Sequence, residues 1–236
     1  VLAVLLGLSG AQAARVQSFS PQGVVSRVQS IQAVFDGNVV VLGDTRAPAP
    51  FVIQCDDPKL SGAGRWLDTR HWVYEFSRAP AAGVSCTATA SPDFRDLKGQ
   101  GIEGASRYSF STGGPRASVR APWSSKIAED QVFVLGFNAD VDAASVGEHV
   151  QCVIQGLGES VPVRLVTGVA RRGILDALGM QGNADSASVQ LVQCKRTLPA
   201  DAKMQLWVQP GVRTLAEQGR ESVTSVRSDT FKYTVR

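Results

Sequence analysis

The sequence predicts an all-β protein built from two tandem β-sandwich domains, and three observations support this. Short runs of alternating apolar and polar residues, bounded by Gly, Pro, Asp and Ser, recur along both halves of the 236-residue chain. Six or seven such runs in roughly 100 residues is the spacing of a β-sandwich. A Gly-Gly-Pro turn near the middle, with a repeated motif on either side, indicates two copies. We therefore expect domains at residues 14–114 and 115–236.

The composition is that of a folded chain without a strong charge. Hydrophobic residues make up 44% and charged residues 19%, so the chain can fill a core. The net charge of +3 gives no polybasic field, and we expect no nucleic-acid partner. The two histidines, His71 and His149, are far apart and no C-x-x-C occurs. We therefore expect neither a metal nor another cofactor.

The first 13 residues have the pattern of the end of a secretory signal. Residues 1–8 are an unbroken apolar run, and Ala11 and Ala13 follow it with the spacing of a cleavage site. The run is too short to span a bilayer, so we expect no membrane span. A buried strand is the alternative interpretation. We expect a mature, exported chain that begins near Ala14 and has no lipid-attachment cysteine after the cleavage site.

The strands are expected wherever one face of an alternating run is apolar. In the first half these runs are Ser30–Phe35, Val39–Leu42, Phe51–Cys55, His71–Phe76, Val84–Ala90 and Arg107–Ser111. In the second half they are Ala117–Arg120, Gln131–Asn138, His149–Gln155, Val161–Val166, Val189–Lys195, Met204–Val208 and Thr230–Val235. Only Arg171–Met180 has helical spacing, which predicts a short helix in the second domain.

An internal repeat supports the duplication. Pro92–Gly101 and Pro210–Gly219 share Pro, Arg, Leu, Gln and Gly without a gap, at an offset of 210 − 92 = 118. Phe35–Val39 and Phe137–Val141 form a second shared element, separated by only 102 residues. The second copy must therefore carry about 16 extra residues between the two elements, and the predicted helix is the natural place for them.

The four cysteines lie two in each half. In an exported protein four cysteines most often form two disulfides, and three connectivities are open from sequence alone. If the halves are separate domains, the pairs are Cys55–Cys86 and Cys152–Cys194. Four free, buried thiols are the alternative.

The chain carries no strong catalytic motif. Neither G-x-S-x-G, H-E-x-x-H nor a P-loop occurs. The adjacent carboxylates Asp56 and Asp57, and the pair Asp140 and Asp142, are typical of solvated turns. His71 and His149 fit strand edges. We therefore expect no catalytic, cofactor-binding or metal-ligating residue, and no enzyme activity in this chain.

Four aromatic residues cluster between residues 66 and 76. Trp72, Tyr74 and Phe76 alternate along one strand, which favours a shared core with Trp66 near the expected Cys55–Cys86 bridge. A sugar-binding platform is the alternative, and it would leave Trp66 and Trp72 exposed.

A series of short motifs extends across both halves. Those of the first half include Phe19, Ser20, Pro21, Gly23, Phe35, Asp36, Cys55, Gly62, Gly64, Arg65, Trp66, Trp72, Tyr74, Phe76, Pro80, Gly83, Cys86, Phe110, Ser111, Thr112 and Pro115. Those of the second half include Glu129, Asp130, Gln131, Phe133, Cys152, Cys194, Arg196, Leu198, Pro199, Phe231, Tyr233, Val235 and Arg236. In this order and spacing they resemble the amino-terminal region of bacterial α-2-macroglobulins, over about residues 19–236.

The resemblance implies the leading two domains of a large periplasmic protease trap. Such proteins are strings of macroglobulin-type, immunoglobulin-like β-sandwiches that hold an attacking protease after it cuts a bait segment. The implied role is defence against host or competitor proteases, with the remaining domains of the same chain and target proteases as partners, and other periplasmic proteins as further candidates. No C-x-E-Q thioester motif is present, and Glu217-Gln218 belongs to the repeat. The missing lipid-attachment cysteine implies a soluble member.

Two other functions remain open from the sequence. Immunoglobulin-like domains of this kind also occur as binding modules of exported adhesins and surface proteins that recognise a glycan or a protein. The chain could also be part of an enzyme whose active site lies outside it. Exposed Trp66 and Trp72 would favour a binding module, whereas buried ones favour a scaffold.

Overall fold

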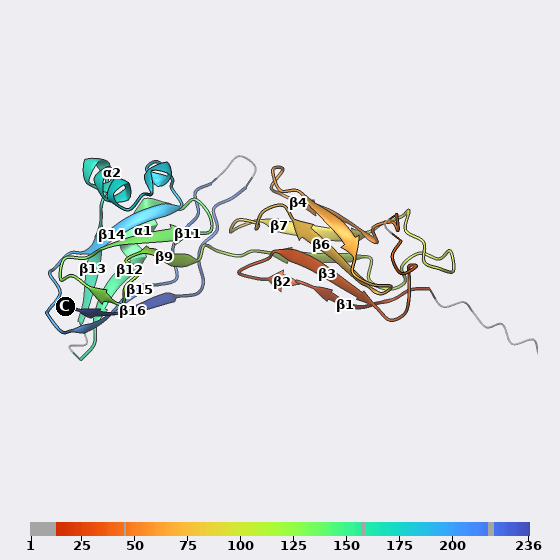
Figure 1. Cartoon of the computed structure of the whole chain (residues 1–236), viewed down its shortest axis with the longest axis horizontal. Coiled ribbons are helices and arrows are strands. Elements are labelled where there is room, and N and C mark those ends of the chain that lie inside the picture. The colour runs from red at the N-terminus through yellow and green to blue at the C-terminus, as the bar shows by residue number, and fades with distance from the viewer. Residues whose placement is uncertain (1–12, 45, 157–158, 217–219) are drawn as a thin grey trace, which may run out of the picture. The chain divides into compact units, whose positions relative to one another are not determined.

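The computed structural model describes residues 13–44, 46–156, 159–216 and 220–236. The segment expected to be a secretory signal lies outside them, except for its last residue. The described chain forms two compact, all-β units, each a β-sandwich with one disulfide (Figure 1). The first unit contains the chain up to Pro80 and Val84–Ser111, and the second contains Ala81–Gly83 and Thr112–Arg236. The predicted fold class is confirmed.

The first unit packs two four-stranded sheets against each other. One sheet has the order β1-β3-β6-β5 and the other has the order β2-β8-β7-β4. The strands are β1 (Val16–Ser20), β2 (Gly23–Val24), β3 (Ser30–Phe35), β4 (Phe51–Cys55), β5 (Gly62–Trp66), β6 (His71–Phe76), β7 (Ser85–Ala90) and β8 (Arg107–Ser111). All neighbours pair antiparallel except β2 and β8, which are parallel.

The second unit repeats this order in a single folded sheet, β10-β16-β15-β12-β13-β14-β11-β9. Its strands are β9 (Ala117–Ala121), β10 (Lys126–Ile127), β11 (Val132–Phe137), β12 (Val150–Ile154), β13 (Glu159–Leu165), β14 (Val189–Cys194), β15 (Lys203–Val208) and β16 (Asp229–Val235). The first half of β13 pairs with β12 and its second half with β14, so β13 passes from one layer to the other. The residues between the two layers form one large apolar core.

The strand orders of the two units correspond element by element. Both have the A-B-E-D and C-F-G order of an immunoglobulin constant-type sandwich, with a short extra strand parallel to the last one. Strand β14 begins 189 − 71 = 118 residues after β6, and β15 begins 203 − 85 = 118 residues after β7. The offset found in the repeated motif therefore reflects a duplicated fold.

The described part of the second unit has two α-helices, α1 (Ala143–His149) and α2 (Gly168–Ala177), and one turn of 3-10 helix, η1 (Gln181–Asn183) (Figure 1). Helix α2 lies between β13 and β14, where the first unit has only a four-residue turn between β5 and β6. The predicted helix and insertion are thus confirmed, although the helix begins three residues earlier than expected. No helix of the described residues is long and apolar enough to cross a membrane.

Several local predictions were wrong. Val39–Leu42 is not a strand, although Val39 and Val40 are both buried. The backbone amides of both valines instead donate to the carbonyl of Thr69. His149 ends α1 rather than starting a strand. Strands β1, β2, β5 and β10 were not predicted, because they are short or rich in glycine and polar residues.

Candidate binding groove

The four cysteines form Cys55–Cys86 in the first unit and Cys152–Cys194 in the second. Cys55 and Cys86 are directly opposed on neighbouring strands β4 and β7. Cys152 and Cys194 lie on β12 and β14, on either side of the crossing strand β13. Since these are all the cysteines of the chain, none is left as a thiol for nucleophilic or thioester chemistry.

The aromatic cluster of the first unit is mainly internal. Trp72 is only 1% exposed and lies 6.0 Å from the ring of Phe51 and 6.2 Å from that of Tyr74. Trp66, Tyr74 and Phe76 are half-buried, and burial raises the pKa of Tyr74. A Cβ at Gly64 would lie 2.5 Å from the Trp72 ring, so only glycine fits beside that indole. Trp72 lies in the core and the other three side chains lie at its border, so the four do not form an open platform.

The ionisable residues noted in the sequence serve local structure. Asp68 accepts hydrogen bonds from the backbone amides of Arg70 and His71 and lies 2.6 Å from His71 Nδ1. The amide of Arg70 contributes most to lowering the pKa of Asp68. Asp57, predicted as a solvated turn residue, is buried and pairs with Arg78 at 2.7 Å. Asp142 caps the start of α1 and pairs with Arg213. Asp56 and Asp140 are exposed.

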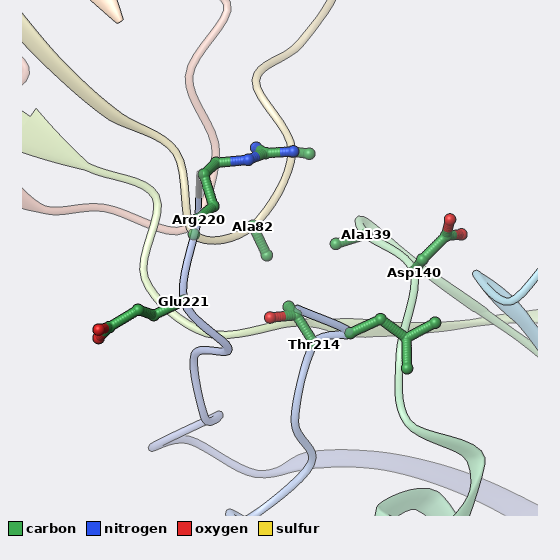
Figure 2. A pocket seen from close by; sticks show the side chains of 9 residues that line it. Ala82, Ala139, Asp140, Thr214, Arg220 and Glu221 are labelled. Atoms are coloured by element: carbon green, nitrogen blue, oxygen red, sulfur yellow. The ribbon is translucent and has the colours of Figure 1, made fainter. Parts of the chain in front are cut away.

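A small pocket of about 50 Å³ lies in the second unit, at Ala81–Gly83 and the segments around residues 139–140, 214–215 and 220–221. Figure 2 shows that the carboxylates of Asp140 and Glu221 point in opposite directions, so its acidic side chains do not converge on one ligand atom. Among the described residues, no group of three or more His, Cys, Asp or Glu could hold a metal ion.

The larger opening in the second unit is a groove of about 630 Å³ beside α2, which we call the α2 groove. Its volume falls within the range of ligand pockets. Its apolar lining residues are Ala121, Pro122, Trp123, Ala128, Val132, Ile174, Ala177 and Leu178. Its polar and charged lining residues are Ser124, Lys126, Asp130, Gln131 and Arg236. It lies where the β9–β10 connection, the start of β11 and α2 meet.

Helix α2 is held in place by apolar packing and by one basic side chain. Leu175 is fully buried in a cluster with Ala121, Val134 and Leu191. The guanidinium of Arg171 donates four hydrogen bonds to backbone carbonyls after the helix. The acceptors are Asn183, Ala184, Ser186 and Val189, at 2.8–3.0 Å. Burial lowers the pKa of Arg171, while Asp185 opposes that effect. The insertion is therefore a fixed wall of the groove.

Trp123 is the exposed large apolar side chain of the groove lining, with an exposed fraction of 78%. No sequence motif described above contains Trp123. A comparison of the two copies could have found it. Pro21 and Gln22 follow β1 in the first copy, whereas Pro122 and Trp123 follow the equivalent strand β9 in the second. Gln22 donates a hydrogen bond back to the carbonyl of Phe19. The second copy thus carries an exposed indole where the first carries a polar side chain used locally.

Comparison with known proteins gives no family. No protein-family model matches the chain, and no curated protein sequence matches it. Among solved structures, an L,D-transpeptidase from Mycobacterium tuberculosis H37Rv is 15% identical with a TM-score of 0.30, and the match covers 65% of each chain.

Two further solved structures are similar at the same low level. An L,D-transpeptidase in complex with imipenem is 11% identical, with a TM-score of 0.34, over 90% of this chain and 81% of the other. The N-terminal part of the bacterial S-layer protein SbsC is 12% identical, with a TM-score of 0.31, over 96% of this chain and 45% of the other. At these TM-scores the likenesses carry no conclusion about function.

Proposed function

We propose that this chain supplies two non-catalytic, leading domains of an exported, macroglobulin-type protease trap that works in the periplasm. The ordered motifs of the sequence and the secretory pattern before residue 14 support this proposal. Two sandwiches in series, each with its own disulfide, fit an oxidising compartment and a modular chain. The partners would be the remaining domains of the same protein and, through them, target proteases.

The burial of Trp72 is the observation that carries the scaffold role. A platform for sugars would present the indole of Trp72 to solvent, yet its side chain is 1% exposed and packs between the two sheets. The disulfide pairing of every cysteine supports the same role, because a thioester would need a cysteine of its own.

The test uses the natural full-length protein and a protease. After mixing, a trap should abolish digestion of a large protein substrate while hydrolysis of a small peptide substrate continues, because the protease is enclosed and its active site is free. If both activities stay unchanged, the trap proposal is wrong. Incubation of the present chain with methylamine, which opens thioesters, should leave its mass unchanged.

A binding module of an exported surface protein is the second candidate. The α2 groove favours it, because an exposed tryptophan in an apolar depression is typical of interaction sites. The two functions differ in the full-length protein: an adhesin would leave protease activity on both substrates unchanged.

A further inference from the structure

We propose that the α2 groove binds an extended, acidic peptide segment, which inserts an apolar side chain beside Trp123 and places a carboxylate near Lys126 and Arg236. This inference goes beyond the trap function and does not depend on it. It concerns the second unit alone and rests on the composition of the groove, its charge, its position at two sheet edges, and the contrast with the first copy.

The apolar part of the groove can take one or two large side chains. Pro122 and Trp123 of the β9–β10 connection line it together with Val132 of β11, Ile174 of α2 and Leu178, which directly follows α2. Trp123 is 78% exposed, although tryptophan is among the residues with most to gain from burial. Aromatic anchors in partly desolvated pockets supply most of the binding energy in many interfaces. An apolar side chain of a ligand would therefore find its contacts here.

The charged part of the groove favours an anion. Lys126 and Arg236 line it together with a single carboxylate, that of Asp130. Within the described residues, none of these three side chains takes part in an ion pair. Counted over the lining side chains, two cations against one anion leave an excess positive charge beside the apolar surface. A ligand carboxylate next to an apolar group complements both features.

The position of the groove favours an extended chain over a compact molecule. Strands β9 and β10 are the two outermost strands of the folded sheet, and the connection between them forms one wall. Edge strands leave backbone groups outside the ladder, and an extended peptide is the ligand that uses such groups. The groove also lies open along the exposed Trp123, whereas a small apolar molecule gains most from an enclosed pocket.

The first copy lacks the helix and the exposed indole at the equivalent place. Its β5–β6 connection has no helix, and Gln22 stands where the second copy has Trp123. The insertion and the exposed indole therefore occur together in one copy and are absent together from the other. Such a pairing is expected if α2 and Trp123 are two walls of one site.

The experiment uses the full chain labelled with 5-fluorotryptophan, which gives one fluorine signal for each of the four tryptophans. Trp123→Phe assigns the Trp123 signal, and Trp207→Phe, at an exposed position outside the groove lining, is the matched control. The probes are a capped hexapeptide with adjacent Phe and Leu flanked by Glu, its twin with Lys in place of Glu, and decanoate.

We expect the acidic peptide to shift the Trp123 signal with saturation, and the basic twin to bind about tenfold more weakly. Lys126→Glu should weaken the acidic peptide by about tenfold, because it reverses the charge that attracts the carboxylate. Lys59→Glu, on an exposed position of the first unit, should leave its affinity unchanged. Unchanged thermal midpoints of both variants will show that folding is intact.

Four results would overturn the inference. The first is equal binding of the acidic and basic peptides, and the second is an unchanged affinity in Lys126→Glu. Saturation by decanoate without binding of either peptide would assign the groove to small amphiphilic anions. A Trp123 shift that depends on protein concentration without any ligand would assign it to a second copy of this chain.

Discussion

The two units use the same strand order but place their disulfides at different positions. In the first unit Cys55 and Cys86 face each other on β4 and β7. At the corresponding position of the second unit, the cross-strand pair on β12 and β15 is Ile154 and Met204, both 1% exposed. One copy thus uses a covalent bond where the other uses two buried apolar side chains. The comparison shows that a disulfide and a buried apolar pair can occupy the same cross-strand position in this fold.

The reverse exchange occurs at the other disulfide. Cys194 of β14 stands 118 residues after Phe76 of β6, and Cys152 occupies the middle of β12 as Ile53 does that of β4. The second unit therefore has a disulfide where the first has a phenylalanine and an isoleucine. In the second unit this bond joins strands on both sides of β13, at the place where the sheet folds from one layer to the other.

The largest expected effect concerns Trp72, whose counterpart 118 residues later is Gln190. Trp72→Ala should destabilise the first unit by about 3–5 kcal/mol, because it removes a fully buried indole. Gln190→Ala should cost about 1 kcal/mol in the second unit, since it removes one hydrogen bond to the Ala187 carbonyl. Denaturant unfolding, monitored through the hydrogen exchange of each unit, measures the loss of stability in both variants. Loss of peptide or sugar binding by Trp72→Ala with unchanged stability would contradict the scaffold role.

The next effect tests the exchange of disulfide and apolar pair. Cys55→Ala/Cys86→Ala opens a loop spanning 31 residues and should cost roughly 3–4 kcal/mol in the chain-entropy account. Cys55→Ile/Cys86→Met, which copies the second unit, should recover about 1–2 kcal/mol through apolar burial. The measurement is the free energy of unfolding of the wild type, the Ala/Ala variant and the Ile/Met variant. If the Ile/Met variant is no more stable than the Ala variant, the two positions are not equivalent.

A smaller and more local effect is expected at Arg171. Arg171→Ala removes four hydrogen bonds to the segment after α2 and should destabilise the insertion by about 2 kcal/mol. Amides of α2 should then exchange faster, while those of β11 and β14 keep their protection. Arg171→Lys should restore only part of the protection, because an ammonium cannot reach four carbonyls in the same geometry. Equal acceleration across the whole second unit would instead show that α2 belongs to the global core.

The smallest effect is the acid dependence of α1. The side chain of Arg213 contributes most to lowering the pKa of Asp142 below its usual value of 3.8. Because the folded-state pKa is lowered, the charged Asp142 stabilises the fold at pH values above the unfolded pKa of 3.8. This stabilisation is lost as the pH falls from about 4 through the folded pKa. Asp142→Asn should cost about 1 kcal/mol or less at pH 7 and flatten the acid loss in the second unit.

The control for this prediction is Asp68→Asn in the first unit, where the amide of Arg70 is the main cause of the lowered pKa. Asp68→Asn should alter how the stability of the first unit depends on acid pH and leave that of the second unit unchanged. Urea unfolding at pH 7 and pH 3, read separately for each unit by hydrogen exchange, makes the comparison. An acid loss in the second unit that Asp142→Asn leaves unchanged would assign it to other carboxylates.

Much of the fold could be predicted from local pattern. The predicted bounds of the strands Ser30–Phe35, Phe51–Cys55 and His71–Phe76 match the structure, because the alternation of apolar and polar residues in them is strong. The motif offsets indicated the duplication and the extra residues of the second copy, and the apolar spacing of Arg171–Met180 indicated the helix. These features depend on neighbours in the sequence, and periodicity records them directly.

Other features depend on residues that are distant in the sequence, and only the tertiary structure decided them. Helix α1 has seven residues and needs Asp142, which Arg213 holds from 71 residues away. The buried residues Val39 and Val40 donate their backbone amides to the carbonyl of Thr69, which lies about 30 residues later in the chain. The α2 groove exists because Trp123 of the β9–β10 connection and Ile174 of α2 line the same depression. Local periodicity carries no information about which distant side chains meet, so these contacts appear only when the chain is folded.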